Sequence, residues 1–206
     1  MDCNYLKRLL ACIADIMQEN RENLIQLDSI VGDGDLGLTM SDGFKAASES
    51  IQNTDETDIG KLLYMAGKAM SVAVPSTMGT LMASGLMQAG KVLKGKTDLS
   101  LIELCSLFKA YEDGVMHRGK AKVGEKTFLD GIDPAILSLE KSVEANEDIQ
   151  AAAQKAYDAS KAGYENTSTM IAIHGRAATR GEASRSLKDP GACVAMLMME
   201  AFVKSL

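Results

Sequence analysis

Residues 77–93 read TMGTLMASGLMQAGKVL and place apolar side chains on every side of a helix, with small residues between them. A helix that is apolar all round is enclosed by other elements. No run of alternating apolar and polar residues, the pattern of a half-buried strand, competes with this interpretation. The stretch therefore predicts a central helix surrounded by other helices.

Four further stretches, which begin near Leu6, Ile59, Leu101 and Ile149, repeat apolar residues every three or four positions. This spacing forms one face of an amphipathic helix. Aromatic residues make up only 4% of the chain and there are 13 methionines, which favours helices packed by aliphatic side chains over strands. We expect an all-α bundle of about eight helices, at residues 2–19, 21–27, 36–51, 57–73, 77–94, 98–117, 130–165 with a break near Asn146, and 190–205.

The length and charge of the chain exclude several classes of protein. Its 206 residues, without an internal repeat or a linker, fit a single domain over residues 1–206. A net charge of −6 argues against nucleic acid as a partner, and no apolar run is long enough for a membrane span. Because the N-terminus lacks the basic and apolar regions of a signal peptide, we expect a cytoplasmic protein. The scattered cysteines are expected to be reduced thiols: Cys3, Cys12, Cys105 and Cys193.

The strongest local signal is the stretch LDSIVGDGDLGLTM, residues 27–40, which carries Asp28, Asp33 and Asp35. Three carboxylates this close repel one another unless a hard cation lies between their oxygens. The following helix offers free amide groups and the positive end of its dipole, which suit a phosphate. The pattern indicates Mg²⁺ bridging the aspartates and phosphate oxygens.

Two other interpretations of this stretch are a turn that caps the next helix and a calcium-binding EF-hand. Its aspartates and glycines are also typical of a turn that only caps the next helix, and the sequence leaves that alternative open. A calcium-binding EF-hand is excluded, because Phe44 occupies the twelfth position of the loop, where a bidentate glutamate is needed.

Two stretches come close to the phosphate-binding P-loop pattern without matching it. Residues 85–92 end in Val92 where serine or threonine should hold Mg²⁺, and residues 119–127 contain the extra residue Glu125. Both follow a helical pattern where a P-loop follows a strand. We therefore expect neither to be a P-loop, although residues 119–127 remain a candidate ligand loop.

A polar connection at residues 174–191, HGRAATRGEASRSLKDPG, concentrates basic side chains in an acidic protein. Guanidinium groups such as that of Arg176 suit phosphate recognition, and a solvated surface loop is the alternative. Pro190 behind Asp189 is ordinary for the start of a helix. His117 and His174 are assigned no role.

Taken together and in order, the three-aspartate loop, RGKAKVGEKTF, GRA and DPG resemble the nucleotide-binding L subunit of dihydroxyacetone kinases over nearly the whole chain. The resemblance implies a closed barrel of eight antiparallel helices that holds ADP or ATP and two Mg²⁺ ions at one end. It implies metal binding by Asp28, Asp33 and Asp35.

The same resemblance implies nucleotide contacts at Gly119 and Phe128, at Arg176 near the phosphates, and at Asp189, Pro190 and Gly191. Three stretches depart from the family pattern, one of them at Thr179, Arg180 and Ala183. Where the family usually reads His-Gly-x-Asn, this chain has Leu36, Gly37, Leu38 and Thr39, and a shorter loop at residues 74–80 replaces the family's glycine-rich loop. In that loop, Ser76, Thr77 and the amides at the following helix start are expected to bind phosphate.

The resemblance implies the phosphoryl-transfer subunit of a dihydroxyacetone-type kinase, in which the aspartates and Arg176 act on the nucleotide phosphates. The ketose is held by a separate K subunit, and the phosphate comes from ATP or from a phosphocarrier of the phosphotransferase system. Two alternatives remain: a nucleotide-binding regulator without catalysis, and a helical interaction module without a ligand.

Overall fold

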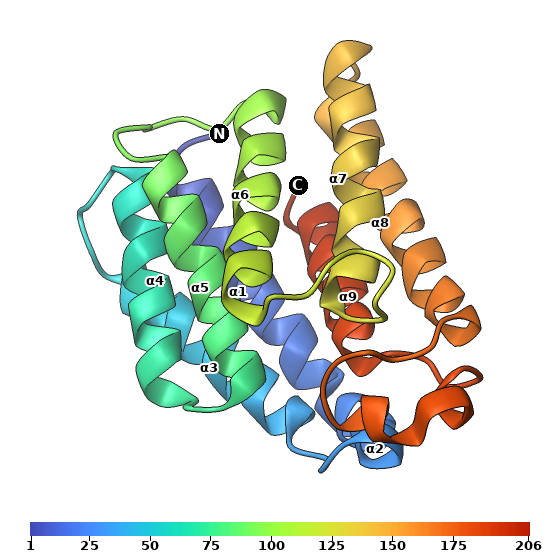
Figure 1. Ribbon diagram of the computed structural model, residues 1–206. Helices are drawn as coiled ribbons and strands as arrows, with labels where there is room; N and C mark the ends of the chain where they lie inside the picture. Colours follow the sequence, from blue (N-terminus) through green and yellow to red (C-terminus); the bar gives the residue numbers. More distant parts are fainter.

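A computed structural model describes residues 1–206 and contains nine α-helices, two 3-10 helices and no strand (Figure 1). The all-α prediction is therefore confirmed. The α-helices are α1 (Cys3–Glu19), α2 (Arg21–Val31), α3 (Leu36–Gln52), α4 (Ile59–Ala73), α5 (Thr77–Val92), α6 (Leu101–Gly119), α7 (Phe128–Glu144), α8 (Ile149–Asn166) and α9 (Pro190–Ser205). The 3-10 helices are η1 (Thr167–Thr169) and η2 (Arg176–Ser184).

The predicted break near Asn146 is confirmed, since Asn146 adopts a positive φ of 52° and Asp148 caps α8 by accepting the amides of Gln150 and Ala151. Several expected boundaries differ from the structure by a few residues. Helix α2 continues to Val31, beyond the predicted end at residue 27, so that Asp28 lies on a helix. The start of α7 at Phe128 also precedes the predicted residue 130.

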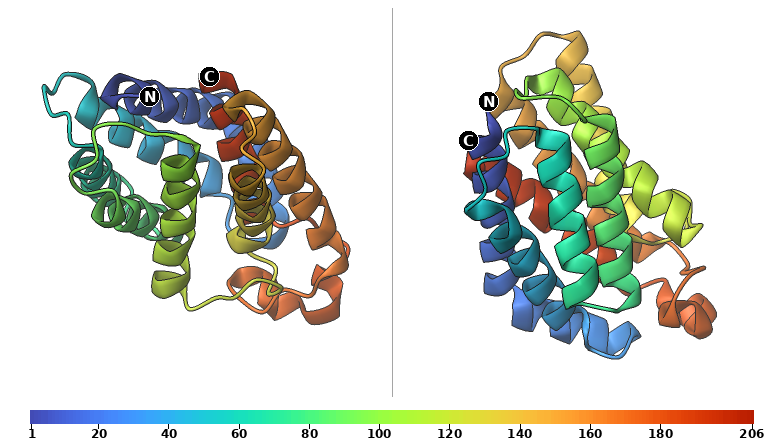
Figure 2. Two further views of the ribbon diagram at one scale, coloured as in Figure 1. Left: turned by 90° about the horizontal axis from the view of Figure 1, so that it is seen from above. Right: turned by 90° about the vertical axis from the view of Figure 1, so that its left-hand side faces the viewer.

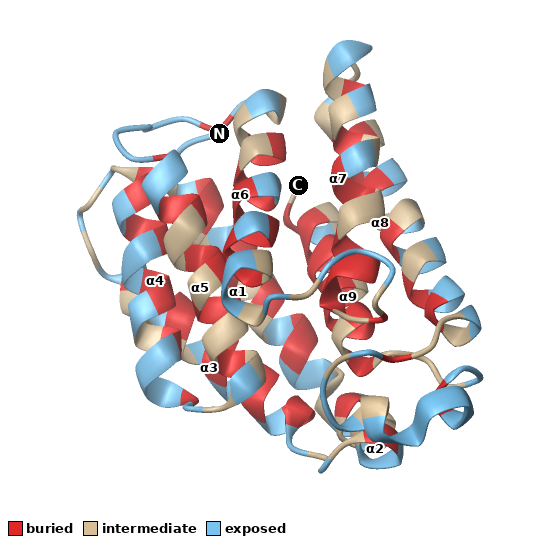
Figure 3. Ribbon diagram, viewed as in Figure 1, coloured by how far each residue is buried: buried red, intermediate tan, exposed pale blue.

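The helices are arranged in a closed ring (Figure 2). From α3 to α7 each helix packs on the next along the chain, α8 packs on α7 and α9, and α1 closes the ring by packing on both α3 and α9. The apolar faces meet inside the ring in one cluster of 51 buried residues, which Figure 3 shows as the inward faces of the helices. No helix combines the length and the apolar composition that a bilayer span requires.

No residue of α5 from Met78 to Gly90 is exposed, as expected, but the helix is a member of the ring between α4 and α6 and does not lie at its centre. Glycines let its neighbours approach closely. A Cβ on Gly60 of α4 would lie 2.5 Å from the Gly90 carbonyl oxygen, and one on Gly114 of α6 would lie 2.6 Å from the Ser84 carbonyl oxygen. Larger residues at these positions would force the three helices apart.

Successive helices around the ring run in opposite directions, and this arrangement determines which helix ends lie together. Helices α3, α5, α7 and α9 all begin at the same end of the ring, where their first residues surround one pocket. The first turn of each helix has amide groups without intrahelical partners and carries a positive partial charge. This end of the ring is therefore suited to anions.

A buried carboxylate lies between α6 and α7, away from the pocket. Glu112 of α6 is 6% exposed and its Oε1 has no hydrogen-bond partner. Burial, and next Asp133 of α7, raise the pKa of Glu112 to about 7. Lys109 opposes this shift, while the carboxylates of Asp113 and Glu140 add to it.

We predict that Glu112→Gln stabilises the protein at alkaline pH. The folded chain keeps the Glu112 proton up to about pH 7, whereas the unfolded chain loses it near pH 4.3, so stability falls as pH rises through this window. The substitution should raise the free energy of unfolding by about 1–3 kcal/mol at pH 8 and change it little at pH 4.5. Urea unfolding at both pH values measures this, with Glu49→Gln, at an exposed position of α3, as control. An equal gain at both pH values would contradict the assignment.

Candidate functional site

A pocket of about 780 Å³ opens at the end of the ring where α3, α5, α7 and α9 begin. Its wall is built from the α2–α3 loop, the start of α5, the end of α6, the start of α7, the loop before η2 and the start of α9. Segments far apart in the sequence thus contribute to one cavity. Most residues predicted as site residues line it: Asp28, Asp33, Asp35, Leu36, Ser76, Thr77, Gly119, Phe128, Arg176, Asp189, Pro190 and Gly191.

The three aspartates converge at one side of this pocket. One carboxylate oxygen from each of Asp28, Asp33 and Asp35 lies within 4.8 Å of the others. Asp28 stands in the last turn of α2, where its Oδ2 accepts the amides of Gly34 at 2.8 Å and Leu36 at 3.4 Å. Gly34 has a φ of +78°, which lets the loop fold back over Asp28.

The capping alternative applies to Asp28, which accepts the amide of the first residue of α3, but not to Asp35. Asp35 immediately precedes α3, yet its side chain caps no amide of that helix. Partial burial, followed by repulsion from Asp33 and Asp28, raises the pKa of Asp35, and Arg176 opposes the shift. These are hard oxygen ligands that gain stability when a divalent cation lies among them, so the donor set fits Mg²⁺.

The guanidinium group of Arg176 lies beside the aspartates. Its Nη2 is 2.5 Å from Oδ2 of Asp33, although 143 residues separate the two in sequence. Both side chains are largely exposed, at 68% and 44%, so this ion pair adds little to stability. Its effect is to place a bidentate donor at the edge of the acidic cluster.

Two helix starts in the wall offer amide groups. Ser76 Oγ accepts the amide of Gly79 at 3.0 Å, and Thr77 and Met78 of the first turn of α5 line the pocket. At α9, the carboxylate of Asp189 accepts the amide of Ala192 at 2.7 Å, and burial raises the pKa of Asp189 to about 7.

An apolar part of the wall accompanies these polar groups. Phe128, the first residue of α7, is 3% exposed and its ring centre lies 6.0 Å from that of Tyr111. Gly119 ends α6 against Leu81, whose Cδ2 would be 3.1 Å from a Cβ at Gly119. The pocket therefore joins an acidic and a basic edge to an apolar surface.

Three of the predicted nucleotide contacts do not line the pocket. Gly37 faces α2, where a Cβ would lie 2.1 Å from the Arg21 carbonyl oxygen. Leu38 points to solvent and is 40% exposed, whereas Thr39 is buried in α3. Because the helix turns these side chains away, only Leu36 of this stretch reaches the cavity.

Several residues that line the pocket were not predicted from the sequence. Arg118 and Thr80 are two of them, because the sequence does not show which face of a helix meets the pocket. His174 was assigned no role, yet it lines the pocket and its Nε2 is 2.6 Å from Oε2 of Glu125. The hydrogen bond from His174 lowers the pKa of Glu125. Only the fold, which brings residues 125 and 174 together, reveals this pair.

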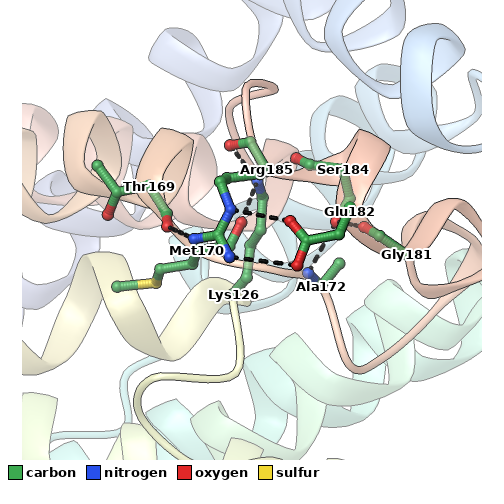
Figure 4. Close-up of polar contacts among 8 residues, drawn as sticks. All are labelled: Lys126, Thr169, Met170, Ala172, Gly181, Glu182, Ser184 and Arg185. Carbon is green, nitrogen blue, oxygen red and sulfur yellow. Dashed lines mark hydrogen bonds and ion pairs between the residues drawn. The ribbon is translucent and has the colours of Figure 1, made fainter.

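Lys126 lines the pocket but points its charge elsewhere. It is 3% exposed, and its Nζ donates to backbone carbonyls of residues 170–187 (Figure 4). The lysine of GEKT thus does not act as a P-loop lysine, in agreement with the rejection of that motif.

The ring of helices and the pocket together define an all-α protein with a combined carboxylate and anion site at one end. The DAK2 domain family matches residues 30–204 of the chain. The chain belongs to this family, which confirms the resemblance found in the sequence.

Proteins similar to this chain are named as kinase subunits. The chain is 35% identical to the ADP-binding subunit DhaL of the PEP-dependent dihydroxyacetone kinase of Escherichia coli, over 90% of this chain and 89% of that one. It is 31% identical to the corresponding subunit of kinase 2 of Listeria innocua, over 100% and 96%.

The fold is also similar to that of a solved kinase. The dihydroxyacetone kinase of C. freundii in its native form matches with a TM-score of 0.76 and 22% identity, over 98% of this chain. Its complex with AMP-PNP and Mg²⁺ matches with a TM-score of 0.74 and 21% identity, over 97% of this chain. This chain spans only about a third of that protein, 34% and 33% respectively.

We predict that Asp35→Asn stabilises the protein in the absence of divalent cations and abolishes its response to Mg²⁺. Removing one of three crowded charges should add about 1 kcal/mol to the free energy of unfolding at low salt. Thermal melts with and without Mg²⁺ measure both effects. The exposed Asp55→Asn, which changes net charge equally, should keep the Mg²⁺ response. A normal Mg²⁺ shift in Asp35→Asn would contradict the site.

Proposed function

We propose that this protein is the ADP- or ATP-binding subunit of a dihydroxyacetone-type kinase, which transfers phosphate from a nucleotide to a ketose held by a separate K subunit. The observation that carries the proposal is the convergence of three aspartates, a guanidinium group and helix starts on one pocket. Its relatives' names as ADP-binding subunits support it.

The aspartates are the proposed metal ligands. Asp28, Asp33 and Asp35 would hold two Mg²⁺ ions, which supply positive charge to the phosphates of the nucleotide. The amides of Gly34 and Leu36 fix one oxygen of Asp28 and so orient its carboxylate toward the cluster. The complex of the C. freundii kinase with AMP-PNP and Mg²⁺ supports this pairing of nucleotide and metal.

The remaining lining residues are the proposed nucleotide contacts. Arg176 stabilises the charge that develops on the transferred phosphoryl group, and amides near Ser76 and Thr77 bind phosphate oxygens. The wall formed by Gly119 and Phe128, with Asp189, Pro190 and Gly191 at the start of α9, holds the rest of the nucleotide. Leu36 lines the pocket where the family usually has histidine, and it supplies only apolar contact.

The acceptor must come from a partner. The pocket's mouth faces solvent at Asp33 and Arg176, which leaves the phosphate end accessible to a second protein. A K-type subunit that binds the ketose fits this arrangement. We propose that a phosphocarrier of the phosphotransferase system or ATP supplies the phosphate, and that the complex works in the cytoplasm.

We predict that Mg²⁺ with ADP stabilises the purified chain. A ligand present at a hundred times its Kd adds about 2.7 kcal/mol to the free energy of unfolding. Thermal melts with Mg²⁺ and ADP or ATP measure the shift, and EDTA or Asp33→Ala should remove it. No shift in the wild-type chain, after bound nucleotide has been removed, would favour the helical interaction module instead.

We predict that Arg176→Ala slows phosphoryl transfer by about a hundredfold or more when the K-type partner is present, because charge on the transferred group loses its donor. Single-turnover assays of the reconstituted pair measure this. Arg180→Ala, an exposed arginine of the same loop outside the pocket, should keep the wild-type rate. Nucleotide binding without any transfer by the wild-type pair would favour the regulator.

A further inference from the structure

The segment that carries Arg176 has almost no hydrophobic core of its own. Within η2 only Ser184 is buried, and the helix is interrupted at Gly181, where φ is +52°. Its outer part, around Arg180, is exposed to solvent. Apolar burial therefore does not explain why Arg176 is held beside the aspartates.

Polar contacts instead close the segment where it leaves the ring of helices. Ser184 Oγ accepts the amide of Ala172 at 3.0 Å, and Arg185 Nη1 donates to the Thr169 carbonyl at 2.7 Å (Figure 4). The two ends of the segment, residues 169–172 and 184–187, thus lie side by side. We call this closed base the neck of the Arg176 loop.

One ammonium group lies inside the neck. Lys126 Nζ donates to carbonyl oxygens from both ends of the loop, so that a single charge joins them (Figure 4). The four acceptors are the carbonyls of Met170 at 3.2 Å, Ser184 at 2.5 Å, Arg185 at 3.3 Å and Leu187 at 2.5 Å.

The Lys126 ammonium and the carbonyl groups of the neck stabilise each other. Lys126 is 3% exposed and has no hydrogen bond to a carboxylate, so the carbonyl dipoles replace the water that its ammonium has lost. Burial lowers the pKa of Lys126, and Asp189 opposes the shift. Without the ammonium, four carbonyls crowd one another around an empty space.

The residues next to Lys126 connect the neck to the pocket wall. Glu125 binds His174 through its side chain at 2.6 Å and accepts the Ile173 amide through its carbonyl at 3.3 Å. Thr127 caps α7, whose first residue, Phe128, lines the pocket. Residues 125–127 therefore fix the Arg176 loop relative to the pocket wall.

We propose that Lys126 is a positioning residue for phosphoryl transfer: its ammonium group holds the neck closed and thereby keeps Arg176 over the pocket. The proposal rests on the proposed function. It assigns Lys126 no contact with the nucleotide, since its charge is directed at backbone carbonyls.

The test replaces Lys126 with a neutral residue of similar length, Lys126→Met, in the full chain. Hydrogen exchange of amides 171–187 in the free protein should accelerate at least tenfold, as expected of local opening. Phosphoryl transfer with the K-type partner should slow by about tenfold to a hundredfold, as expected of a displaced group. Lys122→Met, an exposed lysine of the same connection, removes the same charge and should change neither quantity.

A double substitution separates positioning from a general structural role. If Lys126 acts through Arg176, Lys126→Met should slow transfer no further in a chain that already carries Arg176→Ala. Multiplying effects would overturn the proposal. So would unchanged exchange of the loop, or a loosened loop with the wild-type rate of transfer.

Two further arms keep the test decisive. Should Lys126→Met fail to fold, Lys126→Gln takes its place, because it removes the charge but keeps a hydrogen-bond donor, and unchanged exchange and transfer in that variant would overturn the proposal. A wild-type chain that shows no transfer with its partner would refute the proposed function. Loop exchange, which needs neither nucleotide nor partner, would then still decide whether Lys126 holds the neck.

Discussion

The alternation of chain direction around a closed ring is the constraint on which the rest of this structure depends. Because the chain reverses direction after each long helix from α3 onward, α3, α5, α7 and α9 start at one end of the ring. Their free amides and positive dipole ends meet there, and the connections that precede them gather in the same place. The topology of the helices therefore gives this end of the ring a positive partial charge that favours anions, whichever side chains line the pocket.

The side chains at this end of the ring carry both negative and positive charge. Asp28, Asp33 and Asp35 place negative charge where the helix starts are positive, and of the two that flank α3 only Asp28 accepts amides, while Asp35 caps none. Arg176 relieves part of their mutual repulsion from a loop that belongs to a distant part of the chain. Charge repulsion therefore destabilises the cluster, and a bound cation with its phosphate would neutralise that repulsion.

Much of this arrangement could be predicted from the sequence, and the reasons for the failures are physical. Helical periodicity identified the elements, and the enclosed character of α5 followed from apolar residues on all its sides. The run from Gly37 to Thr39 was assigned to the pocket because it follows the aspartates, but helical rotation turns it away. Lys126 and His174 were missed because their partners lie 44 residues or more away in the sequence. Local patterns carry no information on such contacts.

The way in which Lys126 is bound has a consequence for how this loop can evolve. All four of its acceptors are main-chain carbonyls, which every amino acid provides. Side chains at residues 170 and 184–187 can therefore be exchanged without removing an acceptor. Insertions or deletions within residues 184–187 are different, because they would shift the carbonyls out of register with the ammonium. The contacts of Lys126 thus constrain the path of the main chain, whereas the other contacts of the neck constrain the identity of Ser184 and Arg185.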